Sequence, residues 1–255
     1  TMAYLLARIA DTLCDSGLAT RREREEALQA WRRAVSDRHQ VFVVPQWKEI
    51  PVGEMRLLAF APELLSSWNA MSDEGRRPVL AVLHKLMTAM EWDLLRFTGN
   101  FDEAPVMTPE DLDWYCYHIA GSVGEFWVDI FELDSQWTDA AVRYGKALQR
   151  INILRDIRSD QDRGRWYLPF PKFRGDDRDA RAWTEFVHSY CEETWAGLKA
   201  GEDFCNALPR FSPNKPKKIS HRILRNLVGD ALWRSALGFR FSRCHRHAFK
   251  DSLSS

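Results

Sequence analysis

The chain has 255 residues, and its 36 Lys and Arg residues balance its 36 Asp and Glu residues, so its formal charge is zero. A neutral chain lacks the basic footprint that polyanions select, and we expect no nucleic-acid partner. Hydrophobic residues make up 45% and charged residues 28% of the chain. This balance excludes a disordered protein and is typical of a globular one.

No stretch of about 18 apolar residues is present, and no signal-peptide pattern begins the sequence. We therefore expect a cytoplasmic protein without a transmembrane anchor, whose contact with membranes is at most peripheral. The five cysteines never form a C-x-x-C pair, which predicts reduced thiols and neither a disulfide framework nor a thiolate zinc site. Eleven tryptophans and fourteen phenylalanines indicate either a Trp-rich core or an aromatic-lined cavity.

Apolar residues recur at helical spacing along most of the chain. Thr20 and Glu23 have the spacing of a capping box, and Pro78 is expected in the first turn of the helix that it begins. The predicted helices cover residues 2–15, 20–35, 78–97, 111–131, 139–163, 179–207 and 220–241. The strand-like run 41–44 is too isolated to build a sheet, and no linker divides the chain. We predict one all-α domain over residues 1–255.

The first helix carries a polar stripe on an apolar body. Tyr4, Arg8, Asp11 and Asp15 lie at i, i+4, i+7 and i+11, which is a single helical face. The positions around them are Leu, Ile and Ala, so the helix is expected to be buried. A polar stripe on a buried helix must face a partner or a cavity.

A second stripe lies on the helix predicted over 139–163. Gln149, Asn152, Asp156 and Asp160 lie at i, i+3, i+7 and i+11, again one face of a largely apolar helix. We expect the two stripes to form facing walls. Carboxylates four residues apart repel each other, so a cationic group should lie nearby.

One D-x-x-x-D pattern is common and indicates no more than a solvated helix face. Two such pairs on apolar helices favour a metal site, and hard oxygen donors favour Mg²⁺ over Zn²⁺. The candidate ligands are Asp11, Asp15, Asn152, Asp156 and Asp160. Because Mg²⁺ keeps water and takes substrate phosphates as its other ligands, a phosphate or diphosphate substrate is expected.

Three segments occur in an order and spacing that resemble the squalene/phytoene synthase family, whose members join isoprenyl diphosphates head to head. They are Tyr4-x-x-x-Arg8-x-x-Asp11-Thr-Leu-Cys-Asp15, then Tyr115-Cys-Tyr-His-Ile-Ala-Gly121-Ser-Val-Gly124, and last Gln149-x-x-Asn152-Ile-Leu-Arg155-Asp156-x-x-x-Asp160 with Arg163-Gly-Arg165-Trp-Tyr167-Leu-Pro169. The resemblance covers residues 4–169 and is strongest to bacterial squalene synthases. It implies an all-α isoprenoid synthase fold around a central hydrophobic cavity, and a family N-terminal helix that is missing before Tyr4.

The resemblance also implies roles for individual residues. Arg8, Arg155 and Arg165 would pair with diphosphate oxygens, while Tyr4, Gln149 and Asn152 would complete the polar substrate-binding walls. The four motif aspartates would hold Mg²⁺ and count as catalytic. Tyr115 would transfer a proton or stabilise a cation; without the motif around it, it would be a core tyrosine. Gly121 and Gly124 would permit close helix packing or a kink.

The implied reaction joins two farnesyl diphosphates into presqualene diphosphate and then reduces it to squalene with NADPH. The expected cofactors are therefore Mg²⁺ and NADPH, although no dinucleotide-binding motif is present. Related enzymes that make phytoene, dehydrosqualene, hydroxysqualene or presqualene diphosphate remain alternatives. A catalytically silent relative that acts in assembly is the alternative outside enzymes.

Overall fold

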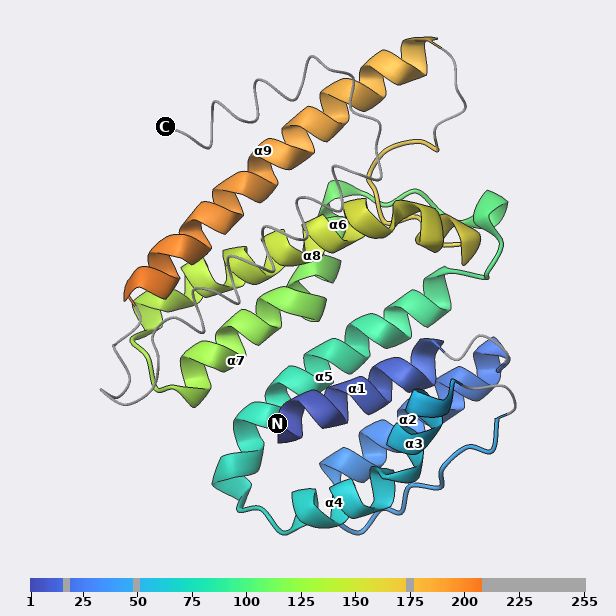
Figure 1. Cartoon of the computed structure of the whole chain (residues 1–255), viewed down its shortest axis with the longest axis vertical. Helices are drawn as coiled ribbons and strands as arrows, with labels where there is room; N and C mark the ends of the chain where they lie inside the picture. The colour runs from blue at the N-terminus through green and yellow to red at the C-terminus, as the bar shows by residue number, and fades with distance from the viewer. Residues whose placement is uncertain (16–18, 48–50, 173–176, 208–255) are drawn as a thin grey trace.

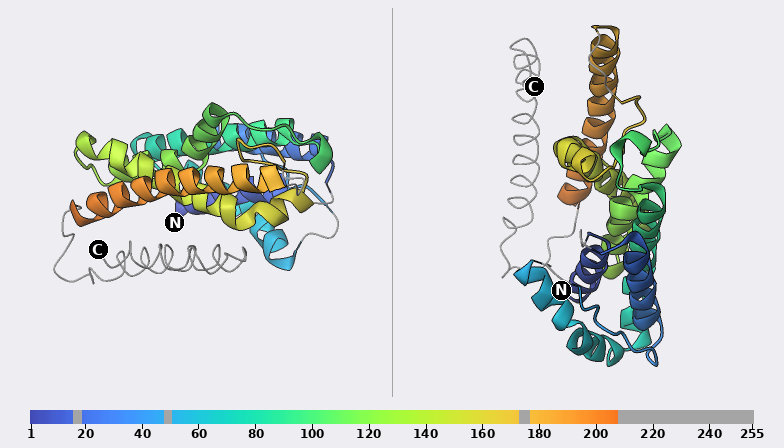
Figure 2. Two further views of the ribbon diagram at one scale, coloured as in Figure 1. Left: turned by 90° about the horizontal axis from the view of Figure 1, so that it is seen from above. Right: turned by 90° about the vertical axis from the view of Figure 1, so that its right-hand side faces the viewer.

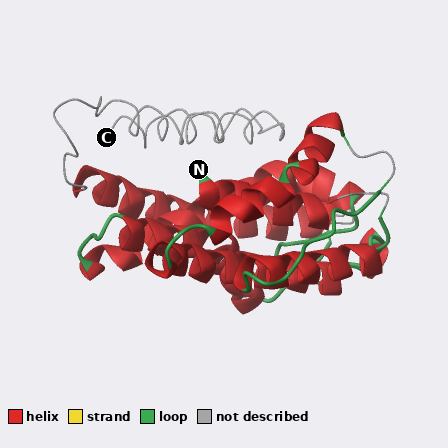
Figure 3. Ribbon diagram, turned by 90° about the horizontal axis from the view of Figure 1, so that it is seen from below, coloured by secondary structure: helices red, strands yellow, loops and turns green. Residues whose placement is uncertain are grey.

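The computed structural model describes residues 1–15, 19–47, 51–172 and 177–207. This part of the chain consists of helices and loops without a strand, as Figure 3 shows, so the all-α prediction is confirmed. The helices are α1 (Met2–Asp15), α2 (Arg21–Ser36), α3 (Val52–Ala59), α4 (Ala61–Asn69), α5 (Asp73–Arg96), α6 (Pro109–Cys116), α7 (Ser122–Ile130), α8 (Thr138–Asp162) and α9 (Asp177–Ala207). A π-helical turn, η2 (Tyr117–Gly121), joins α6 to α7, and the 3₁₀ turns η1 (Phe101–Glu103) and η3 (Ser135–Trp137) lie in loops.

Most predicted helices are present within two residues of their expected ends. The capping box at the start of α2 is formed, with Thr20 and Glu23 each bonding the other's backbone. The stretch predicted as one helix over 111–131 is divided by the π turn. The helix predicted over 220–241 lies outside the described residues, and the four described cysteines are free thiols.

The start of α5 corrects our prediction, because the helix begins five residues before Pro78. The side chain of Ser72 accepts a hydrogen bond from the Gly75 backbone and caps the helix there. Arg76, in the added turn, is buried with its guanidinium 4.7 Å from the centre of the Trp68 ring. The cap and this packing outweigh the tendency of proline to begin a helix.

Helices α3 and α4 were not predicted. Both are short, with eight and nine residues, and a short helix gives little periodic signal. Their buried residues nevertheless include Ala61, Leu64, Leu65 and Trp68, which lie at i, i+3, i+4 and i+7. Residues 41–44 form no strand, as expected, because only Phe42 is buried there and it packs against Trp31.

Helix α5 joins two groups of helices in Figure 1. On one side α1, α2 and α4 pack with α5 around a core that includes Leu6, Ile9, Trp31 and Trp68. On the other side α7 packs on α5 and α8, and α9 runs along α8, as Figure 2 also shows. The tryptophans at the centre of the first group support the Trp-rich core that the composition allowed.

The helices of the second group approach one another unusually closely at glycines. A Cβ atom on Gly124 of α7 would lie 2.3 Å from the carbonyl oxygen of Ala141 in α8. A Cβ on Gly145 of α8 would lie 2.2 Å from the carbonyl oxygen of Ala120 in the π turn. The close packing predicted for Gly124 is therefore present, and Gly145 adds a contact that we did not predict.

Within the described residues, every helix is too short or too polar to cross a lipid bilayer.

Candidate functional site

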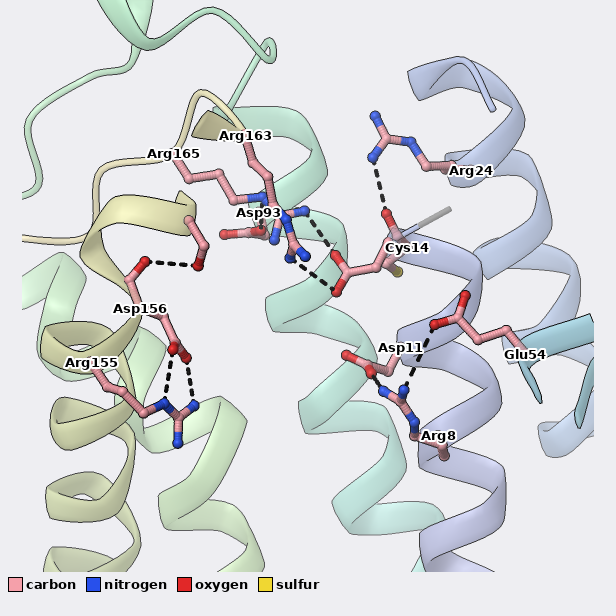
Figure 4. Close-up of polar contacts among 12 residues, drawn as sticks. Arg8, Asp11, Cys14, Arg24, Glu54, Asp93, Arg155, Asp156, Arg163 and Arg165 are labelled. Atoms are coloured by element: carbon pink, nitrogen blue, oxygen red, sulfur yellow. Dashed lines mark hydrogen bonds and ion pairs between the residues drawn. The ribbon is translucent and has the colours of Figure 1, made fainter. Parts of the chain in front are cut away.

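A cavity of about 410 Å³ opens between α1 and α8, with α5 and the end of α6 behind it. All eleven predicted site residues line it, so the expectation of two facing walls is confirmed. These residues are Tyr4, Arg8, Asp11, Asp15, Tyr115, Gln149, Asn152, Arg155, Asp156, Asp160 and Arg165. Figure 4 shows the charged groups of the two walls turned toward the space between them.

The α1 wall forms because opposite faces of one helix have different partners. Leu6, Ile9 and Leu13 are fully buried in the core, and the Trp31 ring nitrogen donates to the Leu6 carbonyl over 3.1 Å. This packing sets the rotation of the helix about its axis. The polar stripe of α1 therefore faces away from the core and toward the cavity.

The end of α8 returns the chain over the cavity. Gly164, just beyond the helix, has a φ of +73°, and the Arg165 backbone donates a 2.7 Å hydrogen bond to the Asp160 carbonyl. A Cβ at Gly164 would lie 2.2 Å from the carbonyl carbon of Gly99, whose own φ is +90°. Only glycine permits this contact, after which Arg165 reaches Asp15 of the α1 wall.

Three of the four motif carboxylates have an arginine partner from the site. Asp11 pairs with Arg8 on the same helix, and Asp156 pairs with Arg155 through two of its nitrogens. Asp15 receives Arg165 from the far end of the site, with Nη2 3.0 Å from Oδ1. Arginine is thus the cation that the repelling carboxylates required.

The four carboxylates do not converge into one cluster. Among the described residues, no three His, Cys, Asp or Glu side chains lie close enough to hold one ion together. One ion held by all the candidate ligands would need the four carboxylates to converge, but each wall keeps its own pair, Asp11 with Asp15 and Asp156 with Asp160. The arginines that pair with these acids occupy the space between the walls.

Burial and mutual repulsion change the acidity of the carboxylates. The pKa of Asp11 is raised by burial and by the charge of Asp15, against the opposing charge of Arg8. Burial raises the pKa of Asp160 to about 7, with Asp156 adding to the shift and Arg165 opposing it. The positive charges of the protein therefore offset the negative charge of Asp11 and of Asp160 only in part.

We expect the protein without added divalent metal to become less stable as the pH rises from 5 to 8. An unfolded aspartate loses its proton near pH 4, whereas Asp160 keeps its proton until about pH 7. In this window the folded state binds more protons than the unfolded state, so the unfolding free energy falls as pH increases. Thermal unfolding followed by scanning fluorimetry should show the fall, and Asp160→Asn should reduce it.

The control for this prediction is Asp139→Asn, an exposed change on the same helix, which should keep the wild-type pH profile. An equal dependence of stability on pH in both variants would contradict the raised pKa of Asp160.

Comparison with known proteins shows which family the chain belongs to. The sequence profile described as squalene/phytoene synthase matches residues 1–211, which include both walls of the cavity. The chain belongs to this family. A presqualene diphosphate synthase from Zymomonas mobilis is 30% identical over 169 residues, which cover 65% of this chain and 49% of that protein.

Two other relatives support the assignment to the squalene/phytoene synthase family. A presqualene diphosphate synthase from Sinorhizobium fredii is 32% identical over 167 residues, covering 65% of this chain and 50% of that protein. A phytoene synthase from Thermus thermophilus is 35% identical over 125 residues, covering 44% of this chain and 43% of that protein. The chain thus spans about half the length of these curated relatives.

Aromatic rings meet at the buried side of the cavity, where Tyr115 and Tyr167 belong to its lining. Tyr115 is 8% exposed and stacks on Tyr167, with ring centres 4.8 Å apart and planes at 21°. Its ring also lies 5.9 Å from that of Trp92. Burial raises the pKa of Tyr115 well above its usual range, and the charge of Asp93 adds to this. The phenol of Tyr115 is therefore neutral at physiological pH.

The site contains residues that we did not assign from the sequence. Arg163 lies 3.8 Å from Asp15, and Tyr167 contacts Tyr115. Asp93 of α5 is buried, and its side chain also lines the cavity. One signal was present for Asp93: it is a lone carboxylate on the helical face that carries Met90 and Leu94.

Proposed function

We propose that the protein joins two prenyl diphosphates head to head, with the diphosphates held at the polar walls and the prenyl tails in the apolar part of the cavity. The observation that carries this proposal is one cavity with a charged and an apolar part of its lining. Paired acids and arginines come from α1, α8 and the segment after α8, whereas Leu86, Met90, Leu94, Ile119 and Ile153 supply apolar surface to the same cavity. A charged head group on a long apolar tail matches both parts.

The donor set fits Mg²⁺. Each wall presents two carboxylates one helical turn apart, and hard oxygen donors suit this ion. Because no cluster of three acids exists among the described side chains, protein would supply only part of each coordination sphere. Water and diphosphate oxygens would supply the rest, which is the usual way proteins bind Mg²⁺ with phosphates. When bound, the metal would stabilise charge on the departing diphosphate.

The arginines of the site would bind the same diphosphates. Arg8 lies on one wall, Arg155 on the other, and Arg165 reaches the α1 wall from beyond α8. A planar guanidinium fits two oxygens of one phosphate group. Each arginine is already held in the cavity lining by a carboxylate, so little ordering is needed when the substrate binds.

The apolar interior would protect the reaction from water. Breaking the carbon–oxygen bond of one allylic diphosphate leaves a carbocation, which the double bond of the second substrate attacks. Loss of one proton then closes the cyclopropane ring of the product. Water in the cavity would convert the cation to an alcohol, so exclusion is part of the chemistry. The neutral ring of Tyr115 lies where its face can stabilise positive charge.

We propose farnesyl diphosphate as the substrate and presqualene diphosphate as the first product. The names of the Zymomonas mobilis and Sinorhizobium fredii relatives support this choice. The name of the Thermus thermophilus relative supports phytoene as the second candidate product. Reduction to squalene with NADPH stays a prediction from the sequence.

The test is to incubate the purified protein with farnesyl diphosphate and Mg²⁺, with and without NADPH, and to identify the lipids by mass spectrometry. We expect presqualene diphosphate without NADPH, and squalene only when NADPH is added. A parallel reaction with geranylgeranyl diphosphate tests for phytoene. Unchanged substrates from a folded sample would contradict the enzymatic proposal and favour a role in assembly.

A further inference from the structure

Asp93 is an unusual residue to find in the lining of the cavity, because it is a buried carboxylate. It lies in the last turn of α5, on the face that carries Met90 and Leu94, and is only 8% exposed. One of its carboxylate oxygens, Oδ1, is buried without a hydrogen-bond partner among the described residues. Burial raises its pKa to about 6, against the charge of Arg165. Such a group costs stability, so a packing role alone would be served better by an apolar residue.

The partners of Asp93 are residues of the site. Its Oδ2 lies 3.6 Å from Nε of Arg165, whose Nη2 lies 3.0 Å from Asp15. Asp93 and Asp15 therefore hold one guanidinium at two of its three nitrogens, which sets the plane of the group. The remaining N–H donors are left for an anion in the cavity.

Asp93 also acts on the aromatic part of the site. Its carboxylate interacts with the side chain of Tyr167, which opposes the rise in the pKa of Asp93. Tyr167 in turn stacks on the ring of Tyr115. The rings of Phe97 and Tyr167 pack edge to face, with their centres 5.2 Å apart. One buried carboxylate thus restrains both the arginine and, through Tyr167, the tyrosine that faces the substrate.

We propose that Asp93 is a positioning residue, which fixes Arg165 and the Tyr167–Tyr115 pair in one arrangement along the cavity lining. The proposal rests on the proposed function for its kinetic consequences but not for its structural ones. Asp93 itself takes no part in bond making or breaking. Its effect should therefore appear in turnover more than in substrate capture.

The kinetic test compares Asp93→Asn, Tyr167→Phe and the double variant with Glu91→Gln. Glu91 is on the same helix and pairs with Arg32 outside the cavity, so its neutralisation controls for loss of charge on α5. We expect Asp93→Asn to lower kcat about 100-fold and to change KM less than threefold. Tyr167→Phe should lower kcat about 10-fold, and the double variant should match Asp93→Asn alone, because both changes break one chain of contacts. Glu91→Gln should keep wild-type kinetics.

The outcomes separate positioning from a purely structural role. Losses that multiply in the double variant, or a kcat of Asp93→Asn within twofold of the wild type, would overturn the proposal. Tyr167→Phe removes a single hydroxyl and keeps the test valid if Asp93→Asn does not fold. A crystal structure of either variant adds a readout independent of activity. We expect displaced Arg165 or Tyr115 side chains on unmoved helices; unchanged side chains would refute positioning even if the wild type proved inactive on prenyl diphosphates.

Discussion

Replacing Asp156 by asparagine should lower turnover by on the order of 10³-fold while leaving the protein folded, and Asp11→Asn should do the same. Each change removes one carboxylate from a wall that would hold Mg²⁺, and loss of Lewis-acid stabilisation costs several kcal/mol in the transition state. The expected measurement is kcat for prenyl diphosphate consumption at saturating Mg²⁺. A folded and fully active double variant would refute the metal assignment.

Stability should change little in these variants. Asp156 loses a part-exposed ion pair with Arg155, which contributes about 1 kcal/mol or less. The change also relieves repulsion of Asp160, whose pKa Asp156 helps to raise. We expect Tm within about 4 °C of the wild type. Asp139→Asn, exposed on the same helix, is the matched control and should change neither turnover nor Tm.

The second large effect is expected from adding one methyl group at Gly145. In Gly145→Ala the new Cβ would lie 2.2 Å from the Ala120 carbonyl oxygen and 3.0 Å from the Gly121 Cα. These are backbone atoms of the π turn, which cannot rotate aside as a side chain can. We expect the unfolding free energy to fall by about 3 kcal/mol or more, which outweighs the ~1 kcal/mol that alanine adds to helix propensity. Tm should fall by on the order of 10 °C.

Gly53→Ala is the matched control for this prediction. Gly53 also lies in a helix, α3, but a Cβ there would meet no atom within 4 Å. The same substitution should therefore raise stability slightly, by about 0.5–1 kcal/mol. Equal effects at the two glycines, measured by thermal and urea unfolding, would show that the close approach of α8 to the π turn has no energetic importance.

The two polar walls could be predicted because the information is local. In α1 and α8 the repeat of 3.6 residues per turn places all polar positions of a stripe on one face, whatever surrounds the helix. The apolar positions beside them indicate burial, and a buried polar face requires a cavity or a partner. Eleven site residues followed from this reasoning together with the family resemblance.

The contacts between distant segments could not be predicted. Arg165 and Asp15 are separated by 150 positions, so no spacing rule relates them. Asp93 is one of several charged residues in α5, and only the packed structure shows that it is buried in the site. Our prediction of the first residue of α5 was wrong for a related reason. Pro78 is a strong local signal, but Ser72 and the packing of Arg76 decide where that helix begins.

The contact between Gly99 and Gly164 joins two loops that are 65 positions apart. A side chain is unfavourable at both glycines, but for different reasons. One has a backbone conformation suited to glycine, and the other has both that conformation and no free space. The backbone contact between the two glycines therefore fixes where Arg165 leaves the chain, and with it how closely its side chain approaches Asp93. The position of a guanidinium that would bind an anionic head group therefore depends on two glycines that do not line the cavity.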